Sequence, residues 1–95
     1  MNTIGPRNVL RHELIGLEAR VVESDEPGHI GIQGRIVDET RNTLTINQGG
    51  GDKIIAKENT IFHFRLPNGA VVEVEGRYLV GRPEDRVKRR RRKLW

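Results

Sequence analysis

The chain has 95 residues, enough for one small domain with a modest core, and 35% of them are hydrophobic. It contains no cysteine, which excludes disulfides and thiolate metal sites. No apolar run approaches the length of a membrane span, and we expect a soluble, cytoplasmic protein. Residues 1–85 carry 10 basic and 13 acidic side chains, whereas residues 86–95 carry seven basic and no acidic ones. Such a basic block is typical of a segment that binds a polyanion.

The N-terminal region is predicted to hold a short helix and then the first strand. Residues 1–7 are expected to be flexible, because a Gly-Pro pair there breaks regular structure. Asn8 is a capping residue type and favours a helix that runs to about Glu13. Residues 17–23 alternate apolar and polar side chains, which predicts a strand. The residues on its apolar face are Leu17, Ala19 and Val21.

The stretch from residue 31 to residue 46 predicts two antiparallel strands joined by a tight polar turn. Ile32 and Ile36 share one face of the first strand, and residues 38–42 interrupt the apolar pattern before it resumes with period two. Two glycines inside the first strand predict a strong bend, or a close approach by another backbone. A small, highly curved barrel requires such bends.

Three more strands are predicted at residues 53–57, 61–66 and 70–75, and residues 76–81 are expected to close the barrel. A Pro-Asn-Gly turn separates the last two strands, because proline presets φ and Asn-Gly tolerates positive φ. The two phenylalanines of residues 61–66 share one strand face and are expected in the core. Repeated short strands with tight turns favour an antiparallel barrel over a parallel sheet.

The predicted fold class is therefore all-β, a small and strongly bent antiparallel barrel of about six strands with short N-terminal and C-terminal helices. Pro83 fits the first turn of the C-terminal helix, and the two acidic residues after it suit the helix dipole. The predicted organisation is a flexible segment, 1–7, a barrel domain with its N-terminal helix, 8–82, and a basic helix or tail, 83–95.

Three motifs occur in the order found in one known family. They are residues 11–17, residues 31–44 and residues 76–86, and the similarity extends from about Pro6 to the basic tail. On these motifs the chain resembles the archaeal ribonuclease P protein component of the Sm-like barrel type, which has a eukaryotic counterpart. The resemblance implies an Sm-like (SH3-like) barrel flanked by terminal helices, in agreement with the pattern of strands and turns.

The resemblance also implies a function, that of an RNA-binding subunit of ribonuclease P, which removes 5′ leaders from precursor tRNA. In that family the RNA subunit holds the catalytic Mg²⁺ ions, so we expect this chain to be non-catalytic in isolation and to bind no cofactor. The implied partners are ribonuclease P RNA, a zinc-ribbon protein subunit and other ribonuclease P proteins, and the isolated chain is expected to be monomeric. The family's protein-contact positions fall on Val9, Leu10, Leu14, Ile30, Ile32 and Val87, although core packing explains the same apolar residues.

Basic side chains are the candidate RNA contacts. Guanidinium groups match phosphate oxygens and stack on bases, but charge alone does not distinguish RNA from DNA. The cations on the strands, Arg65 among them, could line one phosphate-binding face or simply be solvated. Arg82 could instead pair with Glu73 or Glu75. The candidate set is Arg35, Arg41, Lys53, Lys57, Arg77, Arg82, Arg86, Lys88, Arg89, Arg90, Arg91, Arg92 and Lys93.

Two other functions remain open from the residues. In a metal-dependent nuclease, Asp38, Glu39 or Asp52 would hold Mg²⁺, but neighbours on a strand point to opposite faces, so the first two are poorly placed to share an ion. A turn in which Asp38 and Asn42 bond nearby backbone amides explains the same residues, and either acid could hold Arg41. The second alternative is an Sm-like RNA chaperone that acts outside ribonuclease P as a homo-oligomeric ring. No catalytic residues are assigned.

Overall fold

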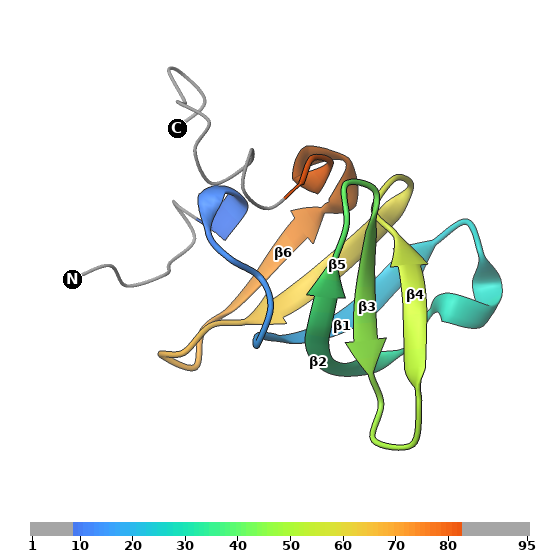
Figure 1. Ribbon diagram of the computed structural model, residues 1–95, viewed down its shortest axis with the longest axis horizontal. Helices are drawn as coiled ribbons and strands as arrows, with labels where there is room; N and C mark the ends of the chain where they lie inside the picture. The colour runs from blue at the N-terminus through green and yellow to red at the C-terminus, as the bar shows by residue number, and fades with distance from the viewer. Residues whose placement is uncertain (1–8, 83–95) are drawn as a thin grey trace.

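The computed structural model describes residues 9–82 and shows an all-β fold (Figure 1). Six antiparallel strands form one sheet with the order β4-β3-β2-β1-β5-β6. The strands are β1 (Glu18–Ser24), β2 (Gln33–Glu39), β3 (Thr43–Asn47), β4 (Asp52–Ala56), β5 (Thr60–Arg65) and β6 (Val71–Glu75). Short 3₁₀ turns occur at η1 (Val9–Arg11), η2 (Pro27–His29) and η3 (Gly76–Leu79). The predicted all-β barrel is confirmed.

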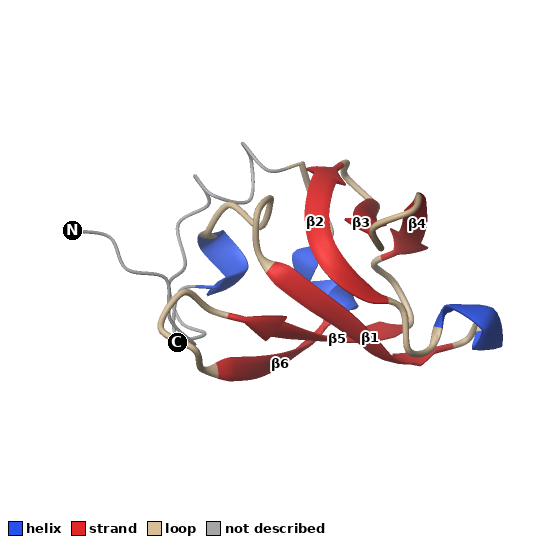
Figure 2. Cartoon of the chain, turned by 90° about the horizontal axis from the view of Figure 1, so that it is seen from below, coloured by secondary structure: helices blue, strands red, loops and turns tan. Residues whose placement is uncertain are grey.

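The sheet curls into a barrel because β2 bends strongly (Figure 2). Strands β1, β5 and β6 lie on one side, and β2 curves away from β1 to join β3 and β4 on the other. A β carbon at Gly34 would lie 2.0 Å from the carbonyl oxygen of Asn47, so only glycine lets β3 approach β2 this closely. The register between β2 and β3 also shifts between Ile36 and Asp38, which is a β-bulge and adds to the bend.

The core lies inside the barrel, where the predicted apolar faces meet. Phe62 and Phe64 are fully buried and stack with ring centroids 5.6 Å apart. Ala19 and Val21 are buried on β1, as the alternating pattern predicted. The remaining core residues are Val9, Leu10, Leu14, Ile32, Ile36, Leu44, Ile46, Ile55, Leu66, Val74 and Leu79.

The N-terminal helix is shorter than predicted. Only Val9–Arg11 form a single 3₁₀ turn, with the His12 amide donating to the Val9 carbonyl at 3.2 Å. The chain then turns so that Leu14 enters the core, which ends the helical path before Glu13. Asn8 and the predicted C-terminal helix lie outside the described residues. Within residues 9–82, no helix is long and apolar enough to cross a membrane.

Candidate nucleic-acid interface

Lys57, a predicted RNA contact, has no exposed surface. Its Nζ donates to Glu39 Oε2 at 2.8 Å, and the side chain of Glu39 is equally shielded. The same ammonium group donates to three backbone carbonyls, those of Thr40 at 2.8 Å, Arg41 at 3.1 Å and Gly81 at 3.0 Å. The prediction for Lys57 is therefore wrong, because the ammonium group is saturated by protein acceptors and closed to phosphate.

The β-bulge in β2 explains why Glu39 points inward. Ile36 faces the core, and without the bulge the next inward residue would be Asp38. The register shift instead leaves Asp38 exposed and places Glu39 inside, opposite Leu44. Lys57 follows Ile55 by two residues and therefore reaches the same interior. Lys53 shares this face by parity, but it is exposed.

The turn between β2 and β3 holds Arg41 in place. The hydroxyl of Thr40 accepts from the Thr43 amide at 3.1 Å and lies 2.7 Å from the Thr43 hydroxyl. Threonine thus stabilises the turn in the role predicted for Asp38 and Asn42. The carbonyl of Arg41 also accepts from the Gly81 amide at 2.8 Å.

These bonds bring Arg41 next to the residues that lead into the C-terminal segment. The β2–β3 turn, the β4–β5 connection and η3 lie at the same end of the barrel (Figure 1). Arg82 follows Gly81 directly, and the side chains of Arg41 and Arg82 are both exposed. Neither forms an ion pair with any residue of the described part, so the alternative pairing of Arg82 with Glu73 or Glu75 is absent there.

Arg77 is exposed but already engaged. Its Nε donates to Glu75 Oε1 at 2.9 Å, and a terminal nitrogen donates to the Tyr78 hydroxyl at 3.0 Å. Its guanidinium carbon lies 4.7 Å from the centre of the Tyr78 ring, a cation–π contact. Arg77 can therefore bind a phosphate only if it gives up its contacts with Glu75 and Tyr78. Arg41 has no ion pair to break within the described residues.

Several basic side chains that are scattered along the sequence lie close together on the outer face of the sheet. Glu18 pairs in register with Arg35 on β2 and with Arg65 on β5. Two residues further along β1, Arg20 pairs with Gln33 and His63. Arg20 was missed, because its importance depends on β1 pairing with two strands that are far apart in the sequence. Strand alternation alone does place it opposite the apolar face of β1.

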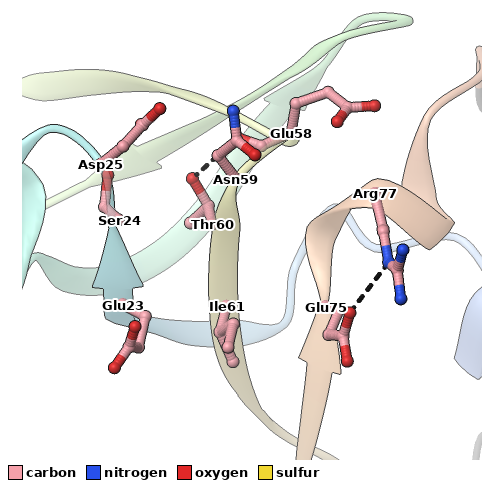
Figure 3. Close-up of a pocket in the computed structure, with 9 residues that line it drawn as sticks. All are labelled: Glu23, Ser24, Asp25, Glu58, Asn59, Thr60, Ile61, Glu75 and Arg77. Carbon is pink, nitrogen blue, oxygen red and sulfur yellow. Dashed lines mark hydrogen bonds and ion pairs between the residues drawn. The ribbon is translucent and has the colours of Figure 1, made fainter.

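A hollow on the described part is acidic (Figure 3). It measures about 600 Å³ and lies where β1 ends, β5 begins and β6 ends. Carboxylates line it, and Arg77 is its one basic lining residue; the acids are Glu23, Asp25, Glu58 and Glu75. No group of three or more ligating side chains in residues 9–82 is arranged to hold a metal ion. This hollow repels a polyanion and does not belong to the candidate interface.

The predicted protein interface is mostly internal. Four of its six residues are buried in the chain's own core. They are Val9 and Leu10 in η1, Leu14 after η1, and Ile32 directly before β2. Core packing, the alternative that the sequence left open, therefore explains these four apolar residues. Ile30 is 51% exposed and remains available. Val87 and the predicted RNA contacts from 86 to 93 lie outside the described residues.

Comparisons with known proteins identify the family. The family model described as Ribonuclease P/MRP, subunit p29, matches residues 7–89. The chain belongs to this family. Ribonuclease P protein component 1 of Methanothermobacter thermautotrophicus is 53% identical over 91 residues, which cover 95% of this chain and 98% of that protein. The protein of the same name from Methanocaldococcus jannaschii is 50% identical over 88 residues, 92% of each chain.

A solved structure supports the same assignment. Mth11, described as a homologue of the human RNase P protein Rpp29, is 52% identical in sequence to this chain. The two structures superpose with a TM-score of 0.59, and the match covers 80% of this chain and 99% of that one. The p29 family therefore accounts for both the sequence motifs and the barrel.

Proposed function

We propose that this p29-family chain is an RNA-binding subunit of ribonuclease P and acts in the removal of 5′ leaders from precursor tRNA. The observation that carries the proposal is the high identity, over nearly the whole chain, to proteins named ribonuclease P protein component 1. These relatives do not favour the alternative of an Sm-like chaperone that acts outside ribonuclease P.

The physical task of the chain is to neutralise phosphates that crowd together in a folded RNA. Arg41 and Arg82 supply exposed guanidinium groups at one end of the barrel, and the sequence continues from there into the basic residues 86–93. Each phosphate that a cation neutralises releases counterions, which makes binding strong and dependent on salt. The Lys57 ammonium group contributes indirectly, because it fixes the backbone on which Arg41 is displayed.

Cleavage itself is assigned to the RNA subunit, which would hold the catalytic Mg²⁺ ions, and the isolated chain is proposed to be non-catalytic. Two of the three acids considered for a nuclease have other uses in the barrel. Glu39 neutralises Lys57 in the core, and Asp52 accepts a hydrogen bond from the Asn47 side-chain amide at 2.8 Å. Neither arrangement presents a pair of carboxylates to a phosphodiester.

A zinc-ribbon subunit of ribonuclease P is the proposed protein partner, and Ile30 is the described residue best placed to touch it. It is 51% exposed in the loop before β2. Ile30→Asp should abolish co-purification of the zinc-ribbon subunit and leave the barrel folded. Ile54→Asp is the matched control, since Ile54 is 65% exposed on β4. Equal loss with both variants would mean that no specific contact involves Ile30.

The first test of function is a native pull-down of the tagged full chain, with sequencing of the bound RNA and a precursor-tRNA cleavage assay on the eluate. One abundant structured RNA together with correct 5′ cleavage supports the proposal. A broad mixture of RNAs without cleavage would overturn it in favour of a general chaperone. Truncation after Asp85 should weaken RNA binding and flatten its salt dependence; an unchanged slope would move the RNA contacts to the barrel.

A further inference from the structure

A second cationic surface lies on the outer face of the sheet, away from the Arg41–Arg82 end. A groove of about 190 Å³ crosses β1, β2, β5 and β6 there. Polar donors dominate its lining, and they include Arg20, Gln33, His63 and Arg65. Arg35 flanks this groove on β2, because it shares the outer face with Gln33 and pairs in register with Glu18.

The three arginines of this outer-face groove are uncommitted. Arg20, Arg35 and Arg65 are exposed, and no ion pair holds any of them among residues 9–82. Glu73 on this face is occupied by His63, whose Nε2 lies 2.9 Å from Glu73 Oε1, and Glu75 on the same face of β6 is paired with Arg77. Asp52 lies in the same cross-strand row as Arg35 and accepts a hydrogen bond from the Asn47 side chain. Glu18 is left facing Arg35 and Arg65, and an added anion would find open guanidinium donors beside it.

Charge is separated along the two strands that carry this groove. At the far end of β1 and the beginning of β5, the acidic hollow of Figure 3 presents Glu23 and Glu58. At the opposite end of the same pair, Arg65 faces Glu18 and Arg20 lies two residues on. A polyanion is therefore attracted to one end of the β1–β5 pair and repelled from the other, which fixes where it can lie.

The groove is built on strands rather than on a loop, so the spacing of its cations is set by the sheet. Arg35 and Arg65 lie on the two strands that flank β1, which separates their backbones by about 10 Å. That span suits two phosphates of one nucleic-acid strand better than a single small anion. An acidic peptide fits less well, since Ala19 and Val71 are the only apolar residues that line the groove.

From these observations we infer that the outer-face groove is a second RNA-phosphate site, separate from the Arg41–Arg82 end, and that the chain holds two segments of RNA at once. Arg35 lies on β2, whereas Arg41 lies beyond the end of β2 in the β2–β3 turn, so the two sites take cations from different parts of this segment. The inference rests on the proposed RNA-binding function, and it adds the location of a contact that does not depend on the basic residues 86–93.

The test compares variants of the full chain in binding to ribonuclease P RNA over a range of salt concentrations. The triple variant Arg20→Gln, Arg35→Gln, Arg65→Gln should bind more weakly, with a salt slope smaller by about two to three, one phosphate per arginine. The matched control replaces the same three arginines by lysine, which keeps the charge and should keep the slope. Unchanged far-UV spectra and thermal midpoints show that all variants are folded.

The outcomes separate the two proposals. If the unmodified chain does not bind this RNA, the proposed function fails. If it binds, and the glutamine variant has the same slope, the groove is not an RNA site and the inference fails alone. Loss of a protein partner with an unchanged RNA slope would likewise overturn the inference, because the groove would then bind an acidic protein surface.

The claim of two RNA segments is tested by tethered cleavage. The chain has no cysteine, so Gln33→Cys in the groove and Asn42→Cys in the β2–β3 turn, where the side chain is exposed, each give a single attachment point for an iron chelate. The two chelates should cut the bound RNA in two separate regions. Cuts in one and the same region would overturn the bridging arrangement.

Discussion

The ammonium group of Lys57 lies 2.8 Å from the carboxylate of Glu39 inside the barrel, and neither side chain has exposed surface. Removal of two charges from water costs several kcal/mol per ion and is repaid only when every polar atom finds a partner. Lys57 meets this condition through three backbone carbonyls, including that of Gly81, which lies 24 residues further along the chain. The pair therefore joins the β2–β3 turn to the segment that follows η3.

Lys57→Met should lower the free energy of unfolding by about 3–5 kcal/mol, since it leaves the Glu39 charge buried without its counter-ion. Urea denaturation of the full chain measures this change. Lys53→Met is the control: Lys53 is exposed on β4, the strand that directly precedes Lys57, and its substitution should alter stability by no more than about 0.5 kcal/mol. Similar midpoints for the two variants would contradict the ion pair.

Replacement of both partners, Lys57→Met with Glu39→Leu, should cost less than the sum of the single changes. The double variant removes the uncompensated charge, but the carbonyls of Thr40, Arg41 and Gly81 still lose a donor. A double-mutant cycle in urea measures the coupling, which we expect at roughly 3 kcal/mol for a pair in direct contact. Additive losses would show that the two charges do not interact.

Gly34→Ala should destabilise the barrel by about 1–3 kcal/mol, because the new methyl group would meet the Asn47 carbonyl oxygen at 2.0 Å and force β3 outward. Gly50→Ala is the matched control. Nothing lies within 4 Å of its β carbon and its φ is negative, so it should be neutral or stabilising by about 0.4–1 kcal/mol. The thermal midpoints of the two variants distinguish steric crowding at Gly34 from the general effect of replacing a glycine by alanine.

Arg41→Gln should weaken binding to ribonuclease P RNA and lower the salt slope by about one, as expected for one lost phosphate contact. Arg77→Gln should have a smaller effect, because the Arg77 guanidinium already donates to Glu75 and Tyr78. Filter binding at several salt concentrations compares the two. An equal decrease for both variants would mean that RNA displaces the Glu75 contact.

The strands were predictable from the sequence because their apolar residues repeat with period two. The alternation placed Val21, Phe62 and Phe64 in the core, and the structure agrees. The bulge in β2 was not predictable, because no unusual residue in the sequence marks it. Beyond the bulge, the residues that face the core are the ones that simple alternation would place outside. For that reason the inward direction of Glu39 and the burial of Lys57 were both missed.

The candidate surface was predictable only in part, because a surface depends on which strands pair. Arg41 and Arg82 were identified from residue type, but their common end of the barrel follows from the Gly81–Arg41 hydrogen bond. The grouping of Arg20 with Arg65 follows from the pairing of β1 with β5, whose residues are some 40 positions apart in the chain. Long-range register of this kind leaves no local signal.

Gly34 and Gly76 mark the fold and carry no information about RNA. A β carbon at either position would meet a backbone carbonyl oxygen, that of Asn47 or of Lys57, at 2.0 or 1.9 Å. Any chain that builds this barrel with the same backbone therefore needs glycine at both positions, whatever it binds. A relative with both glycines but without arginines at positions 20, 35 and 65 would share the barrel of this chain and lack the proposed outer-face RNA site. The two sets of positions thus let the fold and this second site be judged separately in newly sequenced members.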